Sequence, residues 1–281
     1  MRINIAHLGL PEFFDRKSDI IYVLFCALEQ MGHNTSITHN KIERSALNII
    51  VGSDIICNQK KALLDLINSK CDYAIFEVEN FSGKTINYRR DFDLSGYVTL
   101  LRNSKFCFTP YIYNFPQLAK IVGENRTVYT KWGFHPSMIC HRITRGKIFH
   151  HTALFYGLIK ADREKKIRSL SAKLGGEFQV INQDDAFSIR DYYITKCKLG
   201  LSLSYGEYDN FVNPFRVYHM LANGMPVLSD HKQDDDGYTK LCDNMAFEEL
   251  INSISDYKID NELISDKCNE NRLSNSLSIC F

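Results

Sequence analysis

Three cationic side chains and a glycine in the second half of the chain could together hold a phosphate group. Gly157 ends the apolar run ALFYG, and Lys160 and Arg163 follow it directly. Arg216 lies just after Asn213-Pro214, a pair that can start a helix because proline is tolerated in the first helical turn. Helix N-termini and guanidinium groups both bind phosphate oxygens. This set could therefore neutralise a diphosphate and stabilise a departing nucleoside diphosphate without a metal. The alternative to phosphate binding is that Lys160 and Arg163 lie at the solvent-exposed start of a helix.

His219 follows Arg216 by three positions, which puts both on one face of the expected helix. An imidazole can hydrogen-bond a hydroxyl of a ligand held beside the arginine. The alternative is a histidine of the core on an ordinary packing helix. Asn223-Gly224 would end this helix, since both residues tolerate a left-handed conformation.

Carboxylates at two places in the first half could act as a general base toward a hydroxyl group. Glu77 and Glu79 directly follow the expected strand YAIF, and Asp19 is expected in the first turn of a helix capped by Ser18. The alternative for each acid is a structural role, either in a loop or in stabilising a helix N-terminus through its dipole. His135, in WGFHPS, is interpreted as structural.

Basic residues also gather in a polar segment that we expect to form a loop over a cleft, residues 82–95. They are Lys84, Arg89 and Arg90. Residues 1–145 hold 18 Lys and Arg against 13 Asp and Glu, whereas residues 146–281 hold 16 against 20. The first half could therefore face an anionic partner, unless the asymmetry is ordinary surface scatter.

Strand and helix patterns alternate along the chain, which predicts parallel sheets covered by helices. Expected strands lie at 3–10, 35–38, 47–51, 73–76, 105–109, 153–157, 178–182 and 198–204. We predict an α/β protein with two Rossmann-like, doubly wound domains facing a cleft, at residues 1–145 and 146–264. Residues 265–281 are rich in Ser and Asn and are expected to form a poorly packed tail. Ligands of such sheets bind beyond the carboxyl ends of the strands.

Composition excludes several other classes of protein. The 281 residues are 44% hydrophobic and 24% charged, with a net charge of +1. No apolar run is long enough to span a bilayer, so no integral membrane segment is expected. Nine cysteines without a C-x-x-C pair indicate neither a zinc site nor a disulfide framework, and reduced thiols predict a cytoplasmic protein. Neither a G-x-G-x-x-G nor a P-loop pattern is present.

The chain resembles the nucleotide-sugar glycosyltransferases with the GT-B fold, in particular phage DNA β-glucosyltransferases and their spore-protein-like relatives. The resemblance runs over roughly residues 1–255. It rests on the segments SDIIYVLFCALEQMGHN, YAIFEVE, FTPYIYNFPQLAKI, FYGLIKADR and DNFVNPFRVYHMLANGMPVLSD. It implies transfer of a sugar from a nucleotide-sugar, with a UDP-sugar as the expected donor. It implies no bound cofactor, and a divalent metal that is not required but could stimulate activity.

The resemblance also assigns roles to particular residues. Arg216 matches an arginine that contacts the donor diphosphate, and Lys160 and Arg163 match basic residues after the first strand of the second domain. His219 stands where the family typically has a ribose-binding glutamate. The catalytic aspartate of the family falls near Glu77 and Glu79.

The reaction implied is an inverting transfer, because Phe211 and His219 occupy the positions of two glutamates that retaining GT-B families carry. The implied acceptor is hydroxymethylpyrimidine in duplex DNA, contacted by Lys84, Arg89 and Arg90 and flipped out of the stack. Two alternatives stay open. The acceptor could instead be a glycan of a cell-surface polysaccharide or lipopolysaccharide, or the protein could bind a nucleotide or a partner without catalysis.

Overall fold

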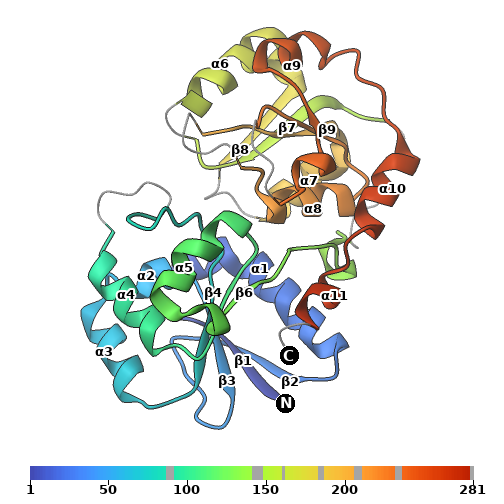
Figure 1. Cartoon of the computed structure of the whole chain (residues 1–281). Helices are drawn as coiled ribbons and strands as arrows, with labels where there is room; N and C mark the ends of the chain where they lie inside the picture. The colour runs from blue at the N-terminus through green and yellow to red at the C-terminus, as the bar shows by residue number, and fades with distance from the viewer. Residues whose placement is uncertain are drawn as a thin grey trace. The chain divides into compact units, whose positions relative to one another are not determined.

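A computed structural model describes residues 1–86, 92–140, 148–159, 162–182, 187–205, 211–231 and 236–278. The chain forms two compact units (Figure 1). Unit 1 comprises Met1–Trp132 and Leu273–Phe281, and unit 2 comprises Gly133–Arg272. The expected boundary between residues 145 and 146 falls outside the described residues. Among the described residues, no helix has the length and apolar content needed to cross a bilayer.

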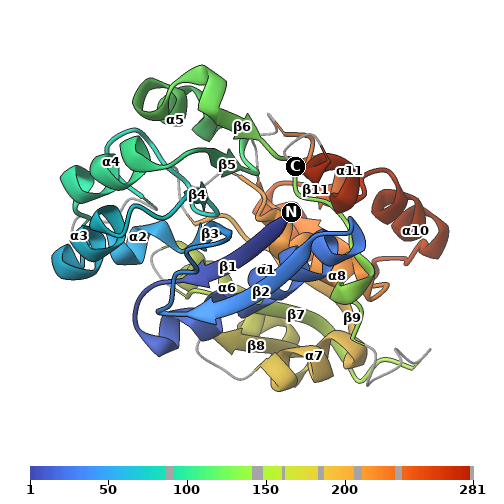
Figure 2. The same ribbon diagram turned by 90° about the horizontal axis from the view of Figure 1, so that it is seen from below.

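Unit 1 is built on a six-stranded parallel sheet of order β2-β1-β3-β4-β5-β6 over its described part, and the labels of Figure 2 follow this order. The strands are β1 (Arg2–His7), β2 (Asn34–His39), β3 (Leu47–Val51), β4 (Tyr73–Phe76), β5 (Cys107–Thr109) and β6 (Thr127–Tyr129). In the register of β1 against β3, Asn4 stands opposite Asn48. Both side chains are fully buried, and the Asn4 amide donates to Asn48 Oδ1 at 2.9 Å. Each buried amide therefore has a hydrogen-bond partner.

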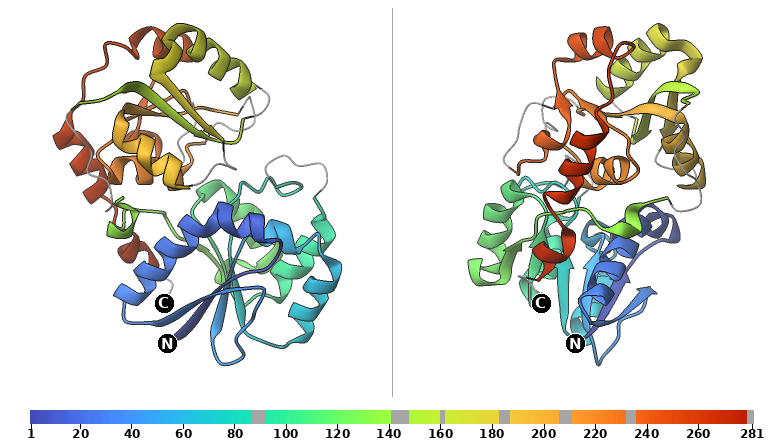
Figure 3. Two further views of the ribbon diagram at one scale, coloured as in Figure 1. Left: turned by 180° about the vertical axis from the view of Figure 1, so that it is seen from behind. Right: turned by 90° about the vertical axis from the view of Figure 1, so that its right-hand side faces the viewer.

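Helices cover both faces of this sheet. Right-handed crossovers place α1 (Pro11–Gln30), which leads from β1 to β2, on one face. Crossovers in the opposite direction along the sheet place α2 to α5 on the other face, and Figure 3 shows this division. Those helices are α2 (Ser53–Ile56), α3 (Lys60–Asn68), α4 (Leu94–Asn103) and α5 (Phe115–Val122). Their core includes Ile75, Tyr97, Leu100 and Leu118, each essentially without exposed surface.

The start of α1 corrects one expectation. The helix begins at Pro11, because a proline at the first helical position loses no backbone hydrogen bond and already has a helical φ. Ser18, expected as the cap, lies within the helix. Asp19 therefore stands in the middle of α1 and not in its first turn, so the helix N-terminus offers no charge stabilisation to its carboxylate.

Helix α4 was not expected, since its sequence follows a polar segment that was interpreted as a loop. Asp93 caps it by accepting a hydrogen bond from the Gly96 N–H at 3.0 Å. Tyr97, Leu100 and Leu101 then form its buried stripe at helical spacing. Of the loop expected over residues 82–95, positions 87–91 lie outside the described residues.

Unit 2 is built on a second parallel sheet, of order β11-β10-β9-β7-β8 over its described part. Its strands are β7 (His151–Gly157), β8 (Phe178–Asn182), β9 (Cys197–Ser202), β10 (Val227–Ser229) and β11 (Asp243–Asn244). Together with unit 1, this sheet confirms the predicted fold class of two Rossmann-like domains of the GT-B type.

Helices lie on both faces of the second sheet as well. Figure 1 shows α6 (Asp162–Leu174) and α9 (Phe247–Ser253) above it, and α7 (Phe187–Lys196) and α8 (Pro214–Ala222) below it. The core between α6, α9 and the sheet includes Phe155, Leu170, Leu201 and Leu250. Helix α8 begins as the sequence indicates, with Pro214 in its first turn and the Asn213 side chain accepting from the Arg216 N–H at 3.1 Å.

The end of the chain is more ordered than expected. In place of a poorly packed tail from residue 265, the structure has α10 (Asn261–Asn269) and α11 (Leu273–Leu277). Leu273 and Leu277 stand four residues apart and are both buried, and α11 packs on α1 within unit 1. The apolar residues of this segment are few but have helical spacing. Composition alone therefore wrongly predicts a poorly packed tail.

Candidate functional site

Each sheet has one point where the strand order reverses. In unit 1 the reversal lies between β1 and β3, and in unit 2 it lies between β7 and β9. Ligands of doubly wound sheets bind at the carboxyl ends of such strand pairs, because the connecting loops diverge there and leave room. We call these places the β1–β3 edge and the β7–β9 edge, and the predicted site residues are described at each.

At the β7–β9 edge, the guanidinium of Arg216 lies directly over Gly157. A Cβ atom on Gly157 would stand 2.4 Å from Arg216 Nη2, and the backbone of Gly157 has a φ of +138°, which favours glycine. The guanidinium carbon also lies 5.6 Å from the ring centre of Phe155 and 5.5 Å from that of Tyr156. The structure thus brings together Gly157 and Arg216, residues far apart in the sequence, at the last position of β7 and the first turns of α8.

Arg163 lies at the same edge but is buried, with 6% of its surface exposed. Its Nε and Nη2 donate to the Leu203 carbonyl at 3.0 and 2.7 Å, and its Nη1 donates to the Leu158 carbonyl at 2.9 Å. These bonds tie the segment after β7 to the end of β9. Lys160, the third predicted cation, lies outside the described residues.

A buried ion pair between Lys166 and Asp230 lies at the β10 side of the same edge. Asp230 accepts hydrogen bonds from the Ser204 N–H at 2.6 Å and the Ser204 hydroxyl at 3.2 Å, and it pairs with the ammonium of Lys166 on α6. The Asp230 side chain is 3% exposed and that of Lys166 is 18% exposed. The ends of β9 and β10 are therefore fixed to each other and to α6, which makes the edge a rigid frame.

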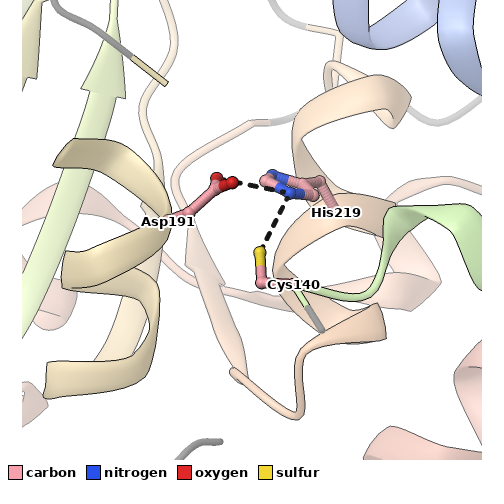
Figure 4. Close-up of side chains that lie close together, drawn as sticks. All are labelled: Cys140, Asp191 and His219. Carbon is pink, nitrogen blue, oxygen red and sulfur yellow. Dashed lines mark hydrogen bonds and ion pairs between the residues drawn. The ribbon is translucent and has the colours of Figure 1, made fainter. Parts of the chain in front are cut away.

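His219 is one turn further along α8, and its ring contacts three side chains. Nδ1 lies 3.3 Å from the Tyr156 hydroxyl, while Nε2 lies 3.7 Å from both Cys140 Sγ and Asp191 Oδ1 (Figure 4). Tyr156 donates its hydroxyl proton to the Arg216 carbonyl at 3.1 Å. Neither Cys140 nor Asp191 was singled out in the sequence, because no local pattern links them to His219.

At the β1–β3 edge, Glu77 follows β4 and is buried, with 1% of its surface exposed. Its carboxyl accepts from the Ser53 hydroxyl at 2.6 Å, the Tyr97 hydroxyl at 2.5 Å and the Glu79 N–H at 2.9 Å. Burial raises the pKa of Glu77 to about 7, although the hydroxyl donors work in the opposite direction. Glu77 therefore organises the loops after β3 and β4.

Glu79 lies two residues further, at the surface of the same loop. Its side chain is 23% exposed and pairs with the ammonium of Lys17, which is 10% exposed on α1. The sequence predicted Glu77 and Glu79 as alternatives, and the structure gives them different environments: one is enclosed and the other is accessible. Asp19 is half-buried on α1. Lys84 is exposed between the bridged residues Phe81 and Ile86, and Arg89 and Arg90 lie outside the described residues.

His7, at the end of β1, is a candidate that the sequence reasoning missed. It is fully buried, and within the described residues neither ring nitrogen has a hydrogen-bond partner. Burial and the nearby His39 and Lys17 lower its pKa to about 4, so the imidazole is neutral near pH 7. Gly52 approaches it so closely that a Cβ there would lie 3.2 Å from the ring. A histidine two positions before a glycine, at the end of the first strand, was the signal available.

No protein-family model matches this sequence, and no curated protein matches it. Solved structures do share its fold. A protein from Listeria monocytogenes described as a UDP-N-acetylglucosamine 2-epimerase matches with a TM-score of 0.57 and 11% identity, covering 99% of this chain and 94% of that one. The lipopolysaccharide outer core galactosyltransferase WaaB matches with a TM-score of 0.50 and 10% identity over 100% of both chains. An alpha-glucosyltransferase, solved with UDP and a 13-mer DNA, matches with a TM-score of 0.50 and 12% identity, covering 100% of this chain and 97% of that one.

Proposed function

We propose that this chain is a glycosyltransferase that uses a nucleoside-diphosphate sugar, with a UDP-sugar as the expected donor. The observation that carries the proposal is the position of the Arg216 guanidinium over Gly157 at the β7–β9 edge. Gly157 leaves space where a side chain would otherwise stand, and the guanidinium supplies a planar set of donors suited to phosphate oxygens. Three proteins with this fold support the donor class, since the name of each includes UDP, a UDP-sugar or sugar transfer.

In the proposed reaction, an oxygen of the acceptor hydroxyl forms a bond to the anomeric carbon of the donor sugar. The bond from that carbon to the phosphate oxygen breaks, and the nucleoside diphosphate leaves with the bonding electron pair. Arg216 and the N-terminal N–H groups of α8 offset the charge that develops on the diphosphate. Gly157 allows this approach. Arg163 holds the loop after β7 and, with Lys160, is proposed to add positive charge. His219 is proposed to contact the donor ribose.

The hydroxyl proton is proposed to pass to a carboxylate of unit 1. Glu79 suits this role best, because its side chain is partly exposed and its carboxylate already pairs with the Lys17 ammonium. Glu77, which is enclosed and receives hydrogen bonds from Ser53, Tyr97 and the Glu79 N–H, is proposed to position Glu79. Asp19 remains a candidate at lower priority, since its place in mid-helix gives its carboxylate no dipole support.

Calorimetric titration with UDP tests the donor site. Arg216→Ala is expected to lower UDP affinity at least tenfold, because a charge-assisted hydrogen bond to phosphate contributes about 1.5–3 kcal/mol. Arg168→Ala is the matched control, since Arg168 is exposed on α6 and pairs only with Glu164 among the contacts described. Equal affinity of the wild type and Arg216→Ala for every nucleoside diphosphate would overturn the proposal.

For the acceptor, we propose a hydroxymethylpyrimidine in duplex DNA, contacted by Lys84, Arg89 and Arg90. The DNA-bound alpha-glucosyltransferase with this fold supports the class, as does the excess of basic residues in residues 1–145. Binding to duplex DNA should weaken as salt rises, because phosphate contacts release counterions. If binding at low salt is absent or does not respond to salt, the glycan acceptor suggested by the lipopolysaccharide enzyme takes its place.

We also propose that the transfer inverts the anomeric configuration. Phe211 and His219 cannot supply the two glutamates of retaining relatives, and a single base at Glu79 suits a direct displacement. A donor with an α-linked sugar should then give a β-linked product, which the anomeric coupling constant in the proton NMR spectrum reports. An α-linked product would establish retention, and the name of the alpha-glucosyltransferase makes this outcome a serious competitor.

A second candidate function is epimerisation of a nucleotide-sugar, which the TM-score of 0.57 to the Listeria monocytogenes protein favours. Measuring products from a panel of donors separates the possibilities. A transferase releases nucleoside diphosphate faster when its acceptor is present, whereas an epimerase converts the sugar with no acceptor. Donor binding without either reaction would instead indicate a binding protein that does not catalyse.

A further inference from the structure

We propose that Cys140, Asp191 and His219 form a binding site for a divalent transition-metal ion, with Zn²⁺ as the expected occupant. Among the residues that the structure describes, these three side chains are the one group of His, Cys, Asp or Glu whose ligand atoms all lie within 4.8 Å of one another. They come from three segments: the turn after η3 (Pro136–Met138), helix α7 and helix α8. The site lies wholly in unit 2, and the proposal does not depend on the proposed function. A metal at Nε2 and the Tyr156 hydroxyl at Nδ1 occupy both ring nitrogens of His219, so with the ion bound the ribose contact proposed above does not form.

The spacing of the three atoms suits a tetrahedral metal. Cys140 Sγ and Asp191 Oδ1 each lie 3.7 Å from His219 Nε2. Zinc–ligand bonds of about 2.0–2.3 Å at tetrahedral angles place neighbouring ligand atoms about 3.3–3.6 Å apart. The two distances from Nε2 therefore exceed the zinc-bound spacing by only a few tenths of an ångström, and all three ligand atoms lie within 4.8 Å of one another.

The tautomer of His219 also suits this role. The Tyr156 hydroxyl bonds the Arg216 carbonyl and lies 3.3 Å from Nδ1, so in the tautomer with the proton on Nδ1 the imidazole donates to this hydroxyl. Nε2 then presents its lone pair to the point between Cys140 and Asp191. A ligating histidine whose other nitrogen is oriented by a hydrogen bond is the usual arrangement at protein metal sites.

The geometry does not suit a nucleophilic triad. In a triad the acid contacts one imidazole nitrogen and the nucleophile contacts the other. Here both Cys140 and Asp191 approach the same nitrogen, Nε2, as Figure 4 shows. A carboxylate and a lone pair repel each other at such a point, and a cation between them removes the repulsion. A thiolate and a carboxylate would also balance the two positive charges of the ion.

Contacts behind the ligands hold the cluster in place. Asn223, the C-cap of α8, accepts from the Cys140 N–H at 2.7 Å and donates to the Met138 carbonyl at 3.0 Å, which fixes the cysteine against α8. Arg190 donates to Asp191 Oδ1 from Nε at 2.9 Å and from Nη2 at 2.7 Å, which holds the carboxylate beside His219. Cysteine and histidine together prefer Zn²⁺ over Mg²⁺ or Ca²⁺.

Titration of the full chain with Co²⁺, after treatment with a chelator and its removal, tests this site. We expect one equivalent to bind with a thiolate-to-cobalt charge-transfer band in the near ultraviolet, and Zn²⁺ to displace it. Cys140→Ser should abolish the band, and Asp191→Asn should weaken binding at least about tenfold. Cys71→Ser is the control, because Cys71 is a half-buried thiol of unit 1 and belongs to no such cluster.

Thermal unfolding gives a second readout. Zn²⁺ should raise the Tm of the wild type and of Cys71→Ser, since a ligand that binds the folded state stabilises it, and it should leave the Tm of Cys140→Ser unchanged. The proposal is overturned if the wild type shows no saturable thiolate–cobalt band, or if the band persists in Cys140→Ser. Should Cys140→Ser fail to fold, retention of full Co²⁺ affinity in Asp191→Asn overturns it equally.

Discussion

The guanidinium of Arg216 occupies the position that a side chain at residue 157 would take, with Nη2 at 2.4 Å from the place of a Cβ atom. Gly157→Ala should therefore displace the guanidinium from the β7–β9 edge and strain a backbone whose φ is +138°. We expect UDP affinity to fall about tenfold and the free energy of unfolding to fall by about 1 kcal/mol. Calorimetry and urea unfolding measure the two effects.

Gly176→Ala is the control for that prediction. Gly176 is exposed, and a Cβ on it would meet no atom within 4 Å. UDP binding by this variant should equal that of the wild type. If both alanine variants lose affinity alike, the effect does not come from Arg216, and the geometric account of the donor site fails.

The buried carboxyl of Glu77 should make stability depend on pH. Burial raises its pKa to about 7, whereas in the unfolded chain it has the ordinary value of 4.5. Between these values the unfolded state loses the proton and the folded state keeps it, so this group lowers the free energy of unfolding as pH rises, by up to about 3 kcal/mol. The loss is complete above about pH 7. Glu77→Gln should therefore become more stable relative to wild type between pH 4.5 and 7, as urea unfolding at several pH values would report. A constant difference would contradict the prediction.

His7 should act in the opposite direction. Its pKa falls from 6.5 to about 4 on burial, so between these values the unfolded state binds a proton that the folded state does not. This group raises the free energy of unfolding as pH rises from about 4 to 6.5. His7→Leu should lose stability relative to wild type over that interval. The same urea series checks the sign, and parallel curves for His7→Leu and wild type would disprove it.

The ion pair of Lys166 with Asp230 should matter more than exposed pairs on the same helix. Asp230→Asn leaves the largely buried ammonium without its partner, so we expect a loss of about 3 kcal/mol in the free energy of unfolding. Glu164→Gln breaks the exposed pair with Arg168 and should change it by less than about 0.5 kcal/mol. Chemical denaturation of both variants tests the contrast, which would be refuted by equal losses.

Replacement of the proposed base gives a prediction for turnover. Glu79→Gln should lower kcat by about 10²–10⁴-fold and leave UDP affinity unchanged, because the carboxylate acts on the acceptor proton and not on the donor. Measuring the rate of nucleoside diphosphate release with saturating donor and acceptor separates the two effects. Glu77→Gln keeps the shape of the side chain that positions Glu79 and should retain more activity. The reverse ranking would assign the base to Glu77.

The sequence predicted the sheets well because their strands are short apolar runs that alternate with helices. The expected strand at residues 73–76 coincides with β4 (Tyr73–Phe76), and the sequence singles out both Gly157 and Arg216, which the structure places in contact. The sequence pattern misplaces Asp19, because α1 begins at Pro11 and not after Ser18. Helix α4 was missed because polar residues precede its apolar stripe.

The cluster of Cys140, Asp191 and His219 lay beyond what a sequence pattern could reveal. Each residue is ordinary in its own segment, and their convergence depends on how the turn after η3 packs on α7 and α8. The burial of His7 likewise follows from the close approach of Gly52 in a neighbouring loop, which no local periodicity encodes. Contacts across segments must be known before such sites can be recognised.

The return of α11 to unit 1 has a consequence for biosynthesis. Leu273 and Leu277 pack on α1, yet they are translated after the whole of unit 2. While the ribosome synthesises residues 133–272, the face of α1 that α11 will cover stays open to solvent or to chaperones. Unit 1 can therefore reach its final form only after residues 273–277 have been synthesised, so α11 acts as a checkpoint for the first domain.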